Sequence, residues 1–103
     1  MNDRLYKFKV NLVIEGIDPD TDPDALEKFD NELSMRPHIN NIRISWVDEH
    51  KKDIAVSFET ESIGPISIRD QMPQELFEVA CAVLRKTERI HIGVTGIEAV
   101  NTI

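Results

Sequence analysis

The sequence is poor in cysteine, in aromatic residues and in long apolar runs. Cys81 is the only cysteine, which rules out an internal disulfide framework. The longest apolar run, Val79 to Leu84, spans six residues, whereas a membrane-spanning helix needs about 20. The N-terminal "MNDRLYK" lacks the apolar segment of a secretory signal. We therefore expect a cytoplasmic protein with no membrane partner.

Positive charge is also scarce, and the negative charge is concentrated in one segment. The net charge is −7, with 19 acidic against 12 basic residues. Residues 18–32 contain seven acids and only Lys28 as a base, which leaves the remainder of the chain nearly neutral. Nucleic-acid-binding surfaces usually have the opposite sign. We expect no nucleic-acid partner.

Four segments alternate apolar and polar residues, the pattern of a half-buried β-strand. The first runs from Tyr6 to Glu15 and turns one apolar side toward the core. The pattern recurs at Ile42, Ile44 and Trp46, at Ile54, Val56 and Phe58, and at Ile90, Ile92 and Val94. The polar residues 48–53 predict a short hairpin loop between the second and third strands.

Two segments have apolar residues at helical spacing. The first helix is expected over residues 23–35, with Asp22 as N-cap, Pro23 in its first position and Asp24 complementing the positive helix end. The second is expected over residues 73–87, with Arg85 and Lys86 in its last turn. The isoleucines of residues 63–68 then form either a small extra strand or a cover over the core.

This order of elements predicts an α+β fold of the ferredoxin-like βαββαβ type, in one domain spanning residues 1–103. It is a two-layer sandwich, with a four-stranded antiparallel sheet in the order 4-1-3-2 and both helices on one face. Apolar residues on one side of each strand are typical of an antiparallel sheet that has one face exposed to solvent. The predicted core contains Phe8, Leu12, Leu33, Ile44, Phe58, Phe77 and Val94.

The aspartates at every second position from Asp18 to Asp24 raise the question of a calcium loop. Such a loop needs glycine at its sixth position and a bidentate glutamate at its twelfth. Counted from Asp18, these positions hold Pro23 and Phe29. We therefore interpret the aspartates as the acidic start of a helix and expect no metal and no cofactor.

No set of residues in the sequence resembles a catalytic constellation. His38, His50 and His91 are not at metal-ligand spacing, and Cys81 is expected to be a small buried residue. The open face of the sheet is the remaining candidate site. Its expected residues are Lys7, Lys9, Asn11, Val13, Arg43, Val47, Ala55, Ser57 and His91.

Two families share this order of elements. "LVIEGI" (Leu12 to Ile17) resembles in layout the shorter motif of the RNA-recognition fold, although Val13 stands where that family usually has an aromatic residue. The element order also resembles that of the ACT regulatory domain, which binds amino acids near the turn into its first helix. Where that family usually has glycine, this chain has "TDPDAL" (Thr21 to Leu26).

These observations favour a non-catalytic interaction or assembly module, homo-oligomeric or bound to another protein through the open sheet face. The alternative is an ACT-like regulatory domain that holds a small molecule near Gly16 to Ala25 or at a subunit boundary. An enzyme is the least favoured of the three, because no acid, base or nucleophile can be nominated.

Overall fold

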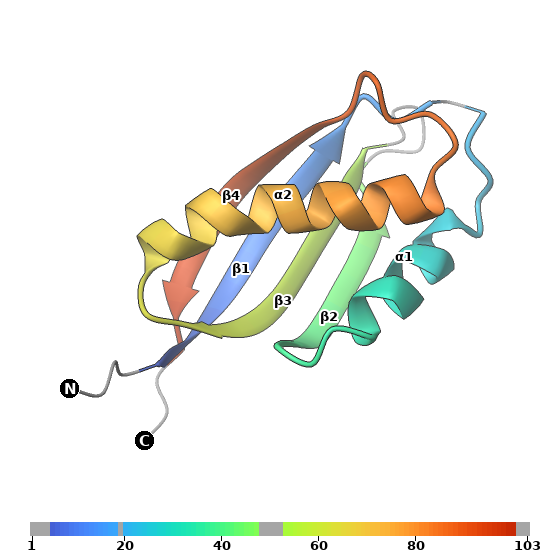
Figure 1. The fold of residues 1–103 in the computed structure, drawn as a ribbon. Helices are drawn as coiled ribbons and strands as arrows, with labels where there is room; N and C mark the ends of the chain where they lie inside the picture. Colours follow the sequence, from blue (N-terminus) through green and yellow to red (C-terminus); the bar gives the residue numbers. More distant parts are fainter. Residues whose placement is uncertain (1–4, 19, 48–52, 101–103) are drawn as a thin grey trace.

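A computed structural model of the chain describes residues 5–18, 20–47 and 53–100. Most of the expected hairpin loop, with His50, lies outside these residues. The elements are β1 (Tyr6–Glu15), α1 (Ala25–Ser34), β2 (Ile39–Trp46), β3 (Ile54–Ser62), α2 (Pro65–Val83) and β4 (His91–Ala99). The four strands form one antiparallel sheet in the order β2-β3-β1-β4. Both helices cross the same face of this sheet (Figure 1). The predicted ferredoxin-like sandwich is confirmed.

The core lies between the two central strands and the helices. The even-numbered residues of β1 from Phe8 to Ile14 are buried, as are those of β3 from Ile54 to Thr60, because alternate side chains of a strand point to one face. Phe29 and Leu33 of α1 pack against them, with Leu76 of α2. The outer strands are less covered, and Ile44 and Val94 are only partly buried.

The first helix begins two residues later than expected. Asp24, rather than Asp22, is its N-cap, and no side chain makes a capping hydrogen bond. Asp22 instead opens a turn in which its backbone oxygen accepts the N–H of Ala25 at 3.0 Å. The prediction of Asp22 as a cap is therefore wrong. The helix ends at Ser34, one residue before the expected end.

The second helix is longer than expected and is shifted toward the N-terminus. It begins at Pro65, directly after the extended residue Gly64, and ends at Val83, with Pro73 in its interior. Ile68 is buried on this helix, so the residues 63–68 form neither an extra strand nor a simple cover. Arg85 lies beyond the helix end rather than in its last turn.

Two residues of α2 are misplaced by the sequence reading. The buried side of the helix is formed by Ile68, Met72, Leu76, Val79 and Ala80. Phe77, expected in the core, is 41% exposed because it follows Leu76 on the helix and so points about 100° away from it. Cys81 is exposed as well, which corrects its prediction as a buried residue. Neither helix is long and apolar enough to cross a membrane, as far as the described residues extend.

Candidate functional site

The open face of the sheet is built from rows of side chains that the strand register sets side by side. Asn11 of β1 lies opposite Ser57 of β3, which in turn lies opposite Arg43 of β2. The next row joins Val13, Ala55 and Ser45 in the same way. Asn11, Val13, Ala55 and Ser57 thus lie together at the centre of the face. On the β4 side, the two rows continue into glycines at 96 and 93.

Small side chains in these two rows leave a shallow hollow of about 400 Å³ at the middle of the face. Asn11, Arg43 and Thr95 stand around it. A methyl group added at Gly93 would meet no atom within 4 Å, so the surface there is open. A second hollow adjoins it at Asn41, which has a positive φ of 53° beside an irregularity in the pairing of β2.

Charged residues gather at one end of the open face. Lys9 lies between Glu59 of β3 and Glu98 of β4, and Lys7 lies opposite Glu61. Cations and carboxylates therefore alternate across the strands, which favours cross-strand attraction within the sheet. The middle rows contain only Arg43 as a charged group, so the centre of the face is far less charged than the segment 18–32.

The remaining predicted residues lie at the borders of the face. His91 is the first residue of β4 and lies opposite Glu15, while Val47 follows the end of β2 and is exposed. The sequence reading missed Gly96 and Glu98, because it ended the last strand at residue 95. The sequence does indicate a longer strand, because Ile97 resumes the apolar alternation after an irregularity at Thr95.

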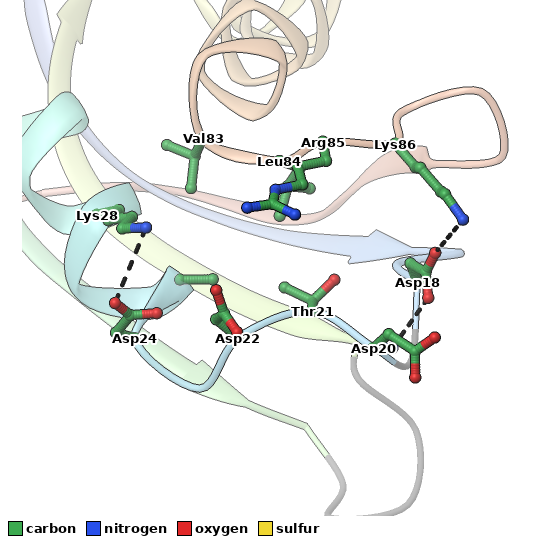
Figure 2. A pocket seen from close by; sticks show the side chains of 11 residues that line it. Asp18, Asp20, Thr21, Asp22, Asp24, Lys28, Val83, Leu84, Arg85 and Lys86 are labelled. Atoms are coloured by element: carbon green, nitrogen blue, oxygen red, sulfur yellow. Dashed lines mark hydrogen bonds and ion pairs between the residues drawn. The ribbon is translucent and has the colours of Figure 1, made fainter.

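A separate cavity of about 260 Å³ lies between the segment that leads into α1 and the end of α2 (Figure 2). Val83 at the end of α2 and its C-cap Leu84 line it, with Arg85 and Lys86 beyond them. The facing wall contains the acidic residues of the loop, and two ion pairs border the space. Lys86 Nζ lies 3.2 Å from Asp18 Oδ2, and Lys28 Nζ lies 3.8 Å from Asp24 Oδ2.

Asp18 is the most constrained carboxylate of this cavity. Its Oδ1 accepts a hydrogen bond from the backbone N–H of Asp20 at 2.9 Å, and its side chain is 24% exposed. This hydrogen bond and then the ion pair with Lys86 lower the pKa of Asp18, because both stabilise the ionised carboxylate. Asp18 therefore stabilises the loop through Asp20 and contacts Lys86 at the cavity rim.

A polar cluster joins the chain after α1 to α2 on the helix side. Glu75 Oε1 lies 3.0 Å from Arg36 Nη1 and 2.7 Å from His38 Nε2. The His38 side chain is 44% exposed and contacts this acidic partner. Across the part of the chain that the structure describes, no group of three or more His, Cys, Asp or Glu side chains is arranged to hold a metal ion.

Neither family models, nor curated proteins, nor solved structures include a match to this chain.

Proposed function

We propose that this chain is a non-catalytic assembly module that associates with a second copy of itself through the open face of its sheet. The observation that supports it is the hollow over the two middle rows, where Val13 and Ala55 are only partly buried. Small side chains let an opposing surface approach the backbone closely. Apolar surface at the centre of an interface, with charges at its rim, is the usual anatomy of a protein contact.

The dimensions of the face are sufficient for such a contact. Each strand is about 30 Å long, and four strands spaced about 4.8 Å apart form a face with an area of roughly 600 Å². Two such faces together would bury about 1,200 Å², the lower end of the range for stable protein interfaces. The charge distribution agrees, because the strongly acidic segment 18–32 lies in the β1–α1 loop and α1, away from the open face.

The test is the molar mass in solution, measured by light scattering for the parent and for two matched variants. Ala55→Glu places a carboxylate in the middle of the hollow and should halve the molar mass of the assembly, because it removes the contact between open faces. Ala82→Glu makes the same change at an exposed position of α2 and should leave the dimer intact. A parent that is monomeric at high concentration, or an Ala55→Glu variant with the molar mass of the parent, would contradict the proposal.

A second candidate function is regulation by a small molecule, and the cavity in Figure 2 favours it. The cavity lies in the region Gly16 to Ala25, where the ACT resemblance leads one to expect an amino acid. Arg85 is a partner for a carboxylate, and the aspartates opposite it suit an ammonium group. A zwitterion matches this mixture of charges better than a simple anion or cation does.

Thermal unfolding in the presence of free amino acids tests this candidate. A ligand that binds only the folded state raises the unfolding temperature, and the rise increases with ligand concentration. The Arg85→Ala variant should lose that response, while Arg69→Ala, on an exposed part of α2, should keep it. No shift across the panel at millimolar concentration would count against a ligand of this class.

A further inference from the structure

The outer edge of β4 is a free strand edge that bears neither lysine nor proline. β4 lies at one end of the sheet, and no described strand pairs with its outer side (Figure 1). Natural proteins commonly guard such edges with lysine or proline, because unpaired backbone groups invite another strand. β4 contains neither, and His91 and Glu98 are its only ionisable residues. Its nine residues are long enough for regular pairing.

The opposite edge of the sheet, formed by β2, is less suited to pairing with a further strand. The pairing of β2 with β3 is irregular between Asn40 and Arg43, and Asn41 has a positive φ. Both edge strands contain an irregularity, but only that of β2 includes a residue with a positive φ, so β2 is the poorer template for a further strand. β2 also bears the charge of Arg43 and has α1 packed beside it. The two edges of this sheet are therefore not equivalent.

β4 also leaves apolar surface uncovered on the helix side of the sheet. Ile92, Val94 and Ile97 pack against the core but remain only partly buried. The equivalent residues of β1, such as Val10 and Leu12, are fully buried. A strand that paired with the outer edge of β4 would cover these three side chains if its own apolar residues lay on the helix side of the sheet.

The irregularity at Thr95 decides which residues share a face along β4. Before it, Gly93 lies opposite Val13, which is on the open face. After it, Gly96 lies opposite Asn11, which is on the open face too. Thr95 is thus the extra residue of a bulge, anchored where its Oγ1 donates to the backbone oxygen of Asn11 at 3.2 Å. Odd-numbered residues face the open side before the bulge, and even-numbered ones after it.

We propose that β4 pairs antiparallel with β4 of a second copy, about a two-fold axis between Val94 and Thr95. This register sets Gly93 opposite the second copy's Gly96, and Ile92 opposite its Ile97. The glycines share the open face and the isoleucines share the helix side, because the bulge shifts the alternation by one residue. In a strand without a bulge, the same register would place open-face residues opposite helix-side residues.

The register also pairs the ionisable residues of the edge. His91 is the fourth residue before the axis and Glu98 the fourth after it, on the same face, so each lies opposite the other in the second copy. Cross-strand pairs of opposite polarity and of large apolar side chains both stabilise sheets. Two Ile92–Ile97 contacts and two His91–Glu98 contacts would arise from one self-complementary segment, as a two-fold interface requires.

The edge pairing does not depend on contact between open faces, because it uses a different surface. It would join two sheets into one of eight strands, with both open faces on the same side. The joined face would measure about 1,200 Å², twice the value for one copy, by the same strand spacing. This joined face could then bind a partner larger than one further copy of the chain.

Disulfide cross-linking tests the register directly, in a Cys81→Ser background that removes the natural thiol. Residues opposite each other in an antiparallel pair have Cβ atoms about 4.5–5.5 Å apart, close to the span of a disulfide. Gly93→Cys and Gly96→Cys proteins, mixed and oxidised, should form a mixed disulfide dimer. Either variant alone should form several-fold less, because identical residues lie about 10 Å apart along the strands.

The outcomes separate the two surfaces. A mixed dimer well above the level of either single variant supports the β4 register. Equal cross-linking in all three samples, or none in any, overturns it. Ala55→Cys in the same background reports on the open face: cross-linking there without a Gly93–Gly96 disulfide would support the face-to-face assembly and reject the edge pairing. As a second readout, backbone amides of Ile92 and Ile97 should exchange several-fold more slowly at high protein concentration than at low.

Discussion

At the scale of single residues, Thr60 is the position where the core is least well satisfied. It is 1% exposed, and its Oγ1 has no hydrogen-bond partner among the described residues. Its neighbours across the strands are the apolar Phe8 and Ile39. A buried hydroxyl without a partner loses its hydrogen bonds to water and gains none in return.

We predict that Thr60→Val raises the free energy of unfolding by about 1 kcal/mol, because the methyl group that replaces the hydroxyl needs no partner. Chemical denaturation measures the change. Thr60→Ser is the matched control: it keeps the hydroxyl and loses a buried methyl group, so it should lower stability by about 1 kcal/mol. A Thr60→Val protein less stable than the parent would show that the hydroxyl has a partner after all.

Gly16 shows a different constraint at the same scale. Its φ of +78° lies in the left-handed region, and an added Cβ would collide with the backbone oxygen of Arg89. β1 can therefore turn sharply toward the acidic loop only with glycine at this position. Gly93, by contrast, has open space around it, so its role is to keep the open face shallow.

At the scale of elements, the sequence was sufficient for the number and order of the strands, and insufficient for the ends of the helices and of β4. The alternation from Tyr6 to Glu15 defines β1 at both ends, because one buried face imposes a strict period of two. The start of α2 was missed because Pro73 resembled a first helical residue. Pro65 satisfies the same rule eight residues earlier, and the spacing of Ile68, Met72 and Leu76 runs through Pro73 without a break.

The candidate site was predictable only in part, for a related reason. Outward positions such as Asn11 and Ser57 follow from the alternation once the strand order is given. The bulge at Thr95 does not follow from it, because one extra residue leaves the composition of a strand unchanged. The cavity beside Arg85 depends on where α2 ends, and the sequence placed that end four residues too late.

The ion-pair cluster at Glu75 fixes α2 to the chain between α1 and β2. Glu75 is 15% exposed and contacts both Arg36 and His38, whereas Glu78 is 60% exposed and lies 3.9 Å from Arg36. We predict that Glu75→Gln lowers the free energy of unfolding by about 1–2 kcal/mol, since partly buried charged groups lose their partner. Glu78→Gln should cost less than about 0.5 kcal/mol, as exposed pairs do. Equal effects in urea denaturation would contradict this distinction.

At the scale of the whole molecule, one layer of side chains holds the sheet and the helices together. Phe58 lies on β3 in the interior of the sheet and is fully buried, together with Phe29 of α1 and Leu76 of α2. A chain of 103 residues has a single core of this kind. Its total stability is expected to be about 5–15 kcal/mol. The loss of one large core side chain is therefore a considerable fraction of the whole.

We predict that Phe58→Ala lowers the free energy of unfolding by about 3–5 kcal/mol, because it removes buried area and leaves a cavity. Phe77→Ala, the same change at a half-exposed position of α2, should cost about 1 kcal/mol or less, since little area there leaves water on folding. Thermal and chemical unfolding of the two variants measures the difference. The contrary result would be a Phe58→Ala protein with the unfolding temperature of the parent, or a Phe77→Ala protein that is the less stable of the two. In that case the even-numbered residues of β3 do not face the helices. The open face proposed as an interface would then be the wrong side of the sheet.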